Sequence, residues 1–210
     1  MVKVAIIGAG FMGSMHAEVY GQLPNVKVAA IVDTRGEKAK FLAEKVGAIP
    51  YLTSDQVFSK PDITIVDICL PTFLHKEFVI KAAEAKKDIV CEKPIALTLE
   101  DAKEMVDICK KNRVRFMVAH VIRFWPEYAF IKKNYDQGRF GKLLTLTCNR
   151  LSPQPTWGWE NWLLNKNYSG GALFDLHIHD VDFILYLLGQ KPVSLYSRGT
   201  YSEEQGYTHV

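Results

Sequence analysis

The pattern of apolar and polar positions is regular over the first 120 residues. Short runs rich in Val and Ile, which hardly alternate with polar residues, predict strands that are buried on both faces. The segments between them have the composition and spacing of helices. The expected strands are Val2–Ile7, Val28–Val32, Ile63–Leu70, Asp88–Cys91 and Arg115–Ala119, and the expected helices are 12–23, 36–46, 75–86 and 99–112. This alternation predicts an α/β fold with a doubly wound parallel sheet.

The pattern changes after Ala119, where a basic and aromatic stretch begins. Beyond it we expect helices at 126–137 and 171–188, strands at 142–150 and 193–201, and a loop with Trp157, Trp159 and Trp162. Neither an internal repeat nor a Pro/Gly-rich linker is present. We therefore expect one domain over residues 1–119 and a second over residues 120–210.

A glycine-rich turn follows the first expected strand. Gly8 lets the chain leave the strand in a tight turn, and Gly10 lets backbone approach a pyrophosphate. Gly13 allows the following helix to pack close to the sheet. The N–H groups of Phe11 and Met12 lie at the start of that helix, whose positive dipole end favours phosphate. Three glycines alone can mark an ordinary turn, but between a strand and a helix they predict a dinucleotide site.

An acidic residue, Asp33, lies twenty residues after Gly13, at the end of the second expected strand. Its carboxylate can accept hydrogen bonds from the adenosine ribose, with Thr34 and Arg35 beside it. A carboxylate repels the 2′-phosphate of NADP, which favours NAD. Arg35 is the counter-signal, because a guanidinium can pair with that phosphate. We therefore expect NAD as the cofactor, with NADP as the less favoured alternative.

Composition is that of an ordinary globular protein. Hydrophobic residues make up 48% and charged residues 23% of the 210 residues, and the net charge of +3 does not indicate nucleic-acid binding. Cys69, Cys91, Cys109 and Cys148 form no CxxC pair, which favours buried thiols in a reducing compartment. The chain starts directly with a strand and has no apolar run of membrane-spanning length. We therefore expect a cytoplasmic protein without a signal peptide or membrane segment.

Further candidate residues follow the expected strands, at the carboxyl ends where open parallel sheets bind ligands. The third expected strand is followed by Pro71 and Thr72, and His75 opens the next helix. Thr72 either offers its hydroxyl and N–H to the nicotinamide ribose or simply caps that helix. The fourth expected strand is followed by Glu92 and Lys93. Lys93 either faces the nicotinamide or is an ordinary solvated lysine.

A last candidate segment follows Gly170 and Gly171. On one helix Asp175, His179 and Asp182 are spaced i, i+4 and i+7 and share a face, and such a stripe of acid and imidazole can handle protons. The alternative is a solvated helix face with one satisfied histidine. A metal site that includes His177 is less favoured, because His177 and His179 diverge around a helix axis. We therefore expect a proton-handling pair, Asp175 and His179, and no metal.

These motifs resemble the Gfo/Idh/MocA family of NAD(P)-dependent oxidoreductases. The matching segments are Gly8-x-Gly10-x-x-Gly13, Pro71-Thr72 with His75, Glu92-Lys93-Pro94, Arg123-Phe124-x-Pro126, Gly138-Arg139-Phe140-Gly141-Lys142, and Gly170-Gly171 through Asp175, His179 and Asp182. The resemblance implies an N-terminal Rossmann domain and a C-terminal α/β domain. The latter has an open, largely antiparallel sheet, which carries the substrate side and often the oligomer interface. Family substrates are sugars, inositols and other polyols, so we also expect a homo-oligomer that acts on such a molecule.

The resemblance also implies roles for individual residues. Lys93 corresponds to the family's active-site lysine, and Asp175 and His179 correspond to its catalytic pair. Oxidation of a secondary alcohol needs a base for the hydroxyl proton and a cation beside the developing alkoxide. We expect His179 to take or relay the proton, Asp175 to orient it and Lys93 to contact the reacting oxygen, although lysine and histidine can exchange roles. Arg123 and Trp162 are expected to join these three in binding substrate.

The chain departs from the family pattern in one respect, since members carry a much longer second domain. We therefore expect the domain over residues 120–210 to be incomplete, with its uncovered surface either left open or covered by association between subunits. Two other functions stay open. One is NAD-dependent glycoside cleavage through transient oxidation, and the other is non-catalytic dinucleotide binding.

Overall fold

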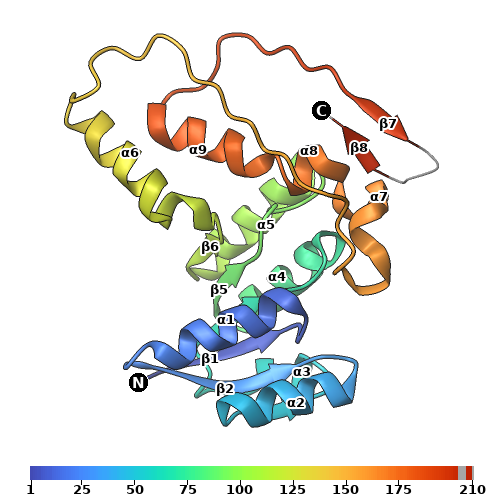
Figure 1. The fold of residues 1–210 in the computed structure, drawn as a ribbon. Helices are drawn as coiled ribbons and strands as arrows, with labels where there is room; N and C mark the ends of the chain where they lie inside the picture. Colours follow the sequence, from blue (N-terminus) through green and yellow to red (C-terminus); the bar gives the residue numbers. More distant parts are fainter. Residues whose placement is uncertain (203–206, 210) are drawn as a thin grey trace. The chain divides into compact units, whose positions relative to one another are not determined.

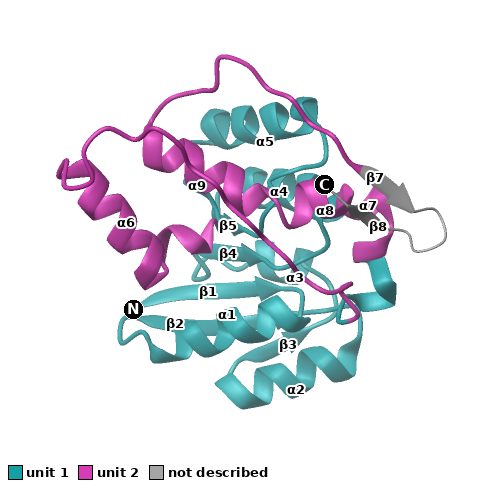
Figure 2. Ribbon diagram, turned by 45° about the horizontal axis from the view of Figure 1, so that its top comes forward, with its two compact units in different colours: residues 1–119, 157–162 teal, residues 120–156, 163–210 magenta. Residues whose placement is uncertain are grey.

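The computed structural model describes residues 1–202 and 207–209, which fall into two compact units (Figure 2). Unit 1 consists of residues 1–119 and 157–162. Unit 2 consists of residues 120–156 and the described residues from 163 onward. Residues 157–162 therefore group with the N-terminal part of the chain, although they come after residue 120.

Unit 1 is built on one parallel sheet (Figure 1). Its strands are β1 (Val2–Ile7), β2 (Val26–Val32), β3 (Ile49–Tyr51), β4 (Ile65–Ile68), β5 (Asp88–Cys91) and β6 (Phe116–Val118). They lie in the order β3-β2-β1-β4-β5-β6, and every neighbouring pair is parallel. The strand order reverses between β1 and β4, the switch point at which dinucleotides bind in such sheets. The predicted parallel α/β fold is confirmed.

Helices cover both faces of this sheet. The helical segments of unit 1 are α1 (Phe11–Gln22), α2 (Gly36–Val46), α3 (Asp55–Phe58), the 3-10 turn η1 (Thr72–Leu74), α4 (His75–Glu84) and α5 (Leu99–Asn112). Successive side chains of β1 point to opposite faces and enter two cores. Ile6 packs with Ala17 of α1 and Leu42 of α2, whereas Ile7 lies in a core that contains Met105 of α5. The strands are buried on both sides, which explains their nearly unbroken apolar runs.

The regular elements of unit 2 are mainly helices. Its elements are η2 (Val121–Phe124), α6 (Pro126–Asp136), α7 (Lys166–Ser169), α8 (Gly171–Asp175), α9 (Ile178–Leu188), β7 (Thr200–Ser202) and β8 (Tyr207–His209), and the 3-10 segment η3 (Trp159–Leu164) contributes its last residues. A small core of Ile122, Phe183 and Leu187 joins η2 to α9, and Tyr128 of α6 packs against it. No helix in the described part of the chain combines the length and the apolar character that crossing a bilayer requires.

Two expected strands of the second domain are wrong over most of their length. Residues 142–150 form no strand, and neither do residues 193–199. The strand expected over 193–201 therefore begins only at Thr200, as β7. The sequence at 142–150 has a strand-like composition, but an isolated strand leaves its backbone N–H and C=O groups unpaired. No described residue pairs with it. The described strands β7 and β8 pair antiparallel with each other, and a larger antiparallel sheet stays a prediction.

The expected helix over 171–188 is wrong as one continuous element, because it consists of α8 and α9. The N–H of His177 donates to the carbonyl of Ala172, five residues back, at 2.9 Å. A regular helix would use the carbonyl four residues back, so the chain widens here before α9 begins. Asp175 closes α8 and His179 lies in the first turn of α9. The regular i, i+4 geometry expected for this pair does not apply.

Candidate active site

The glycine-rich turn has the shape that a pyrophosphate requires. Gly8 has a φ of +104°, and a Cβ there would lie 2.4 Å from the carbonyl oxygen of Cys69. A Cβ on Gly13 would lie 1.8 Å from the carbonyl oxygen of Gly8, whereas the space beside Gly10 is open for 4 Å. Gly10 caps α1 without a side-chain hydrogen bond, and the first turn carries no acid. The helix N-terminus is therefore suited to an anionic ligand.

The carboxylate of Asp33 is buried and already accepts a full set of hydrogen bonds. Oδ2 accepts from the N–H of Ala9 at 2.9 Å and from a guanidinium nitrogen of Arg35 at 2.8 Å. Oδ1 accepts from the backbone N–H and from Nε of Arg35, both at 2.9 Å. Burial by itself raises the pKa of Asp33, but the hydrogen bonds with Arg35 and Ala9 outweigh it and lower the pKa. The group is therefore an ionised acceptor, which the ribose of a dinucleotide would have to share with Arg35.

The tryptophan loop, residues 157–162 of unit 1, lies beside Phe11 of α1 and Arg35. The ring centroids of Trp157 and Phe11 lie 5.4 Å apart, and the guanidinium of Arg35 lies 5.7 Å from the ring centre of Trp159. Trp162 is half-buried and also belongs to unit 1. Its expected contact with substrate stays a prediction.

Thr72 and His75 lie at the carboxyl end of β4. Thr72 is 2% exposed, and its hydroxyl has no hydrogen-bond partner among the described residues. Helix α4 has no side-chain cap, and its N-cap residue is Leu74, so the alternative role of Thr72 as the cap of that helix is not observed. An orphaned buried hydroxyl fits a ligand such as a ribose. The ring nitrogens of buried His75 each lie 2.9 Å from a backbone carbonyl, those of Leu70 and Pro94, so His75 ties together the segments that follow β4 and β5.

Glu92 and Lys93 directly follow β5. Glu92 is buried, and its Oε2 accepts a hydrogen bond from the backbone N–H of Lys93 at 3.0 Å. Burial alone raises the pKa of Glu92, but hydrogen bonding and charge from His16 outweigh it and lower the pKa, with a smaller contribution from the charge of Lys93. Lys93 itself is half-buried. The carboxylate of Glu92 thus holds the backbone N–H of Lys93, the next residue in the chain.

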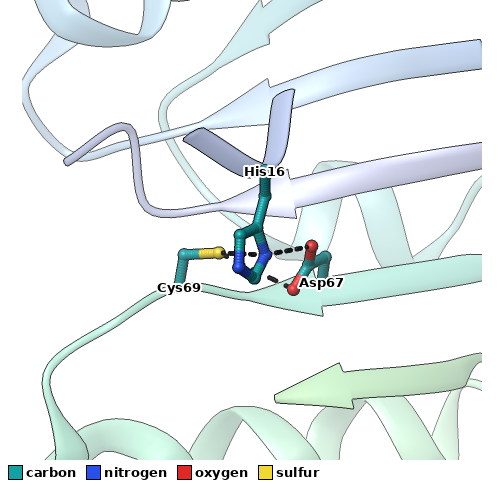
Figure 3. A group of neighbouring side chains, drawn as sticks. All are labelled: His16, Asp67 and Cys69. Atoms are coloured by element: carbon teal, nitrogen blue, oxygen red, sulfur yellow. Dashed lines mark hydrogen bonds and ion pairs between the residues drawn. The ribbon is translucent and has the colours of Figure 1, made fainter. Parts of the chain in front are cut away.

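A cluster that the sequence analysis did not identify lies beside these strand ends (Figure 3). His16 of α1 contacts Asp67 of β4 and Cys69, which follows β4, and the candidate ligand atoms of the three residues lie within 4.8 Å of one another. An acid inside an apolar strand, as in Ile65–Ile68, is the one sequence signal that points to it. The residues of 175–182 that we weighed as metal ligands form no comparable group within the described residues.

The expected substrate residue Arg123 is paired within unit 2. Its guanidinium binds both carboxylate oxygens of buried Asp182, with Nε 2.7 Å from Oδ2. Nδ1 of His120 lies 3.6 Å from the same carboxylate, and the ring centre of Tyr186 lies 4.9 Å from the guanidinium carbon. Arg123 and Asp182 therefore form an ion pair, and the ring of His120 lies beside it. Whether Arg123 binds substrate is a prediction that these contacts do not test.

Asp175 and His179 are both half-buried and come from consecutive short helices. Between them in the chain lies His177, whose Nδ1 is 3.4 Å from Asp180. Asp180 is also held by Arg150 through two hydrogen bonds of 2.8 Å. Arg150 and Asp180 lie thirty positions apart in the sequence, and nothing in the pattern marks them as partners. The catalytic roles of Asp175 and His179 stay predictions.

Comparison with known proteins identifies related chains over both units. Residues 2–120 match the family described as oxidoreductase family, NAD-binding Rossmann fold, and residues 128–209 match the GFO/IDH/MocA C-terminal domain. A 2,7-anhydro-N-acetylneuraminate hydratase from Escherichia coli (strain K12) is 34% identical over 198 residues, which is 91% of this chain and 51% of that protein.

Solved structures of sugar and polyol dehydrogenases are similar as well. Levoglucosan dehydrogenase in complex with NADH has a TM-score of 0.78 at 32% identity, over 90% of this chain and 54% of that one. A myo-inositol 2-dehydrogenase from Lactobacillus plantarum has a TM-score of 0.78 at 27% identity, over 91% of this chain and 57% of that one. The chain thus spans about half the length of the curated relatives it matches.

Proposed function

Because the chain belongs to the Gfo/Idh/MocA family of NAD-binding oxidoreductases, we propose that it transfers a hydride between NAD and a secondary alcohol of a sugar, inositol or related polyol. The observation that carries the proposal is that the candidate residues all follow strands at one edge of the sheet. The glycine turn follows β1, Asp33 follows β2 and Lys93 follows β5. Neighbouring parallel strands end at the same edge, so groups for phosphate, ribose and the reacting oxygen share one side of unit 1.

The residues of the chain have separate roles in this reaction. Bound NAD supplies the hydride acceptor. Lys93 donates a hydrogen bond to the oxygen of the reacting carbon, where negative charge develops as the hydroxyl proton leaves. His179 takes or relays that proton, and Asp175 orients the imidazole. The exchange of roles between Lys93 and His179 is compatible with the same chemistry. Arg123 and Trp162 contribute to substrate binding.

The preference for NAD is supported by the environment of Asp33. Its pKa is lowered, so the carboxylate is ionised at neutral pH and repels a 2′-phosphate. Arg35 is the residue that could attract this phosphate, but its guanidinium is engaged by Asp33 and lies against Trp159. A 2′-phosphate would have to compete with the carboxylate for Arg35.

We also propose that unit 2 contributes to an open, largely antiparallel sheet and that copies of the protein associate through it. The strand-like composition of 142–150 and the exposure of its Leu144, at 84%, support this proposal. Size-exclusion chromatography with light scattering tests the association, and a monomer at micromolar concentration would contradict it. The four free cysteines are compatible with a cytoplasmic location, which we propose as well.

The proposed reaction is tested by following NADH formation with a panel of sugars and inositols. We expect net NADH formation with at least one free polyol, whereas product release without net NADH would favour cleavage through transient oxidation. Lys93→Met should lower kcat by about 100-fold or more, since it removes a hydrogen-bond donor from the reacting oxygen, with the NAD affinity nearly unchanged. Lys103→Met, at an exposed position on α5, is the matched control. Near-normal turnover of Lys93→Met would refute the role of this lysine.

A further inference from the structure

Five buried or half-buried polar side chains of unit 1 form a continuous group, the His16 cluster, which consists of His16, Tyr20, Asp67, Cys69 and Glu92. His16 is its centre. Nδ1 lies 2.8 Å from Oδ2 of Asp67, and Nε2 lies 3.1 Å from Oε1 of Glu92. The side chain of His16 is 15% exposed, that of Glu92 7% and that of Asp67 0%. These groups are shielded from water, so their charges must be balanced within the cluster.

Both ring nitrogens of His16 face carboxylates, and this fixes its protonation. Nδ1 hydrogen-bonds with Asp67, and Nε2 lies within ion-pair distance of Glu92 without a hydrogen bond between them. Two adjacent negative charges stabilise the ring as an imidazolium. Burial by itself lowers the pKa of His16, but the interactions with Asp67, Cys69 and Glu92 outweigh it and raise the pKa far above its usual value. His16 is thus a buried positive charge between two negative ones.

The remaining members are Cys69 and Tyr20, and Sγ of Cys69 lies 3.4 Å from Nδ1 of His16. Burial raises the pKa of the Cys69 thiol, and its Sγ lies 3.6 Å from Oδ1 of Asp67 as a donor. Burial and the charge of Asp67 raise the pKa of Tyr20, whose ring centroid lies 6.5 Å from that of His16. A metal ion bound by His16, Asp67 and Cys69 would need a lone pair on Nδ1 and a thiolate. The distances are those of an ion-paired network, with Nδ1 2.8 Å from Asp67 and Nε2 3.1 Å from Glu92, and Zn²⁺ binding is one outcome of the test below.

The cluster ends on the backbone of Lys93. Glu92 faces His16 with Oε1, and with Oε2 it accepts the N–H of Lys93 at 3.0 Å. We propose that His16 is a positioning residue. Its charge keeps Glu92 ionised and oriented, and Glu92 holds the backbone of Lys93 in place at the end of β5. The inference rests on the role proposed for Lys93, and it connects that residue to α1, the helix that begins at the glycine turn.

Loss of the imidazolium has a defined physical consequence. In His16→Gln the two buried carboxylates of Asp67 and Glu92 face an uncharged side chain, so no positive charge lies between them. One of them then takes up a proton near neutral pH. A protonated Glu92 holds the Lys93 backbone less firmly and also changes the charge beside its ammonium group. Both the titration of Lys93 and the pH dependence of turnover should therefore change.

The charge state is tested by NMR on the 210-residue chain with 15N-labelled histidine, and the His16 signal is assigned by its loss in His16→Gln. We expect both ring nitrogens to stay protonated from about pH 6 to about pH 9, a range in which an ordinary histidine becomes neutral. A neutral His16 ring at pH 7 would overturn the proposal. Stoichiometric Zn²⁺ binding in calorimetry, lost in Cys69→Ser, would overturn it as well.

The positioning role is tested on Lys93 itself, through its 13C-dimethylated amine, assigned with Lys93→Met. His16→Gln should shift the pH at which this signal titrates, whereas Glu18→Gln, at an exposed position on the same helix, should not. An unchanged titration in His16→Gln would refute the role. If that variant does not fold, His16→Gln with Asp67→Asn removes one carboxylate together with the cation and serves in its place, with the same expected shift.

Kinetics provide a second readout. With a polyol that the wild-type chain oxidises, His16→Gln should lower kcat roughly 10- to 100-fold, the effect of a displaced reacting group, with the KM for NAD changed less than about twofold. An unchanged kcat and pH profile would contradict the proposal. If the wild-type chain oxidises no polyol, the proposed function fails, whereas the two NMR measurements still decide the role of His16.

Discussion

Removal of the Arg35 side chain should tighten the binding of NAD. The carboxylate of Asp33 has room for about four hydrogen bonds, and all four are taken, two by backbone N–H groups and two by the guanidinium. In the proposed site the ribose hydroxyls would take the positions that the guanidinium occupies. Binding therefore requires Arg35 to leave Asp33, and Arg35→Ala removes this competition in advance.

The size of the effect follows from the exposure of the pair. The side chain of Arg35 is 34% exposed and that of Asp33 6%, so solvent weakens their attraction although two parallel hydrogen bonds join them. Such a pair contributes about 1 kcal/mol, the upper end of the range for partly exposed ion pairs. One kcal/mol corresponds to a change of about fivefold in Kd. For NADP the sign is opposite, because Arg35 is the cation available to the 2′-phosphate.

Isothermal titration calorimetry measures both affinities. We expect Arg35→Ala to lower the Kd for NAD about fivefold and to raise the Kd for NADP. Lys38→Ala, which removes an exposed charge from the first turn of α2, controls for a general loss of positive charge and should change the NAD affinity little. If the Kd for NAD instead rises tenfold in Arg35→Ala, the guanidinium assists NAD directly and the reasoning is wrong.

Two further predictions concern stability. Gly13→Ala should destabilise unit 1 by more than about 3 kcal/mol, because the new Cβ would lie 1.8 Å from a backbone oxygen. Gly21→Ala on the same helix, which has open space around it, should stabilise by about 0.5–1 kcal/mol. Urea unfolding measures both changes in the free energy of unfolding, and equal effects would contradict the close packing at Gly13. Because the pKa of His16 is raised in the folded state, its contribution to stability is complete below the unfolded pKa of about 6.5 and is lost as pH rises toward the folded pKa. The free energy of unfolding should thus decline between about pH 7 and pH 9 by up to about 1.4 kcal/mol per pH unit, and a decline of the same slope in His16→Gln would show that another group causes it.

The sheet of unit 1 was predictable because burial on both faces leaves a clear mark on the sequence. β1, β2, β4, β5 and β6 all appear as short apolar runs. β3 was missed, since its three residues, Ile49–Tyr51, include a proline and lie at the sheet edge. Local pattern also failed at 142–150 and at the break between α8 and α9. In both places the outcome depends on pairing and backbone geometry, which composition does not encode.

The residues of the candidate site also include some that the sequence predicts and some that it does not. Gly8, Asp33 and Lys93 were predictable because each follows a strand, and sheet order alone carries strand ends to a common edge. His16 lies inside a helix, and Asp67 lies inside a strand 51 positions later. Nothing local marks them as partners. What links them is the order β1-β4-β5 in the sheet, which places α1, the residues of β4 and the turn after β5 around one small volume. In a buried volume of this kind each charge requires its counter-charge, so the ion pairs that surround the proposed active-site lysine are a consequence of the fold as a whole.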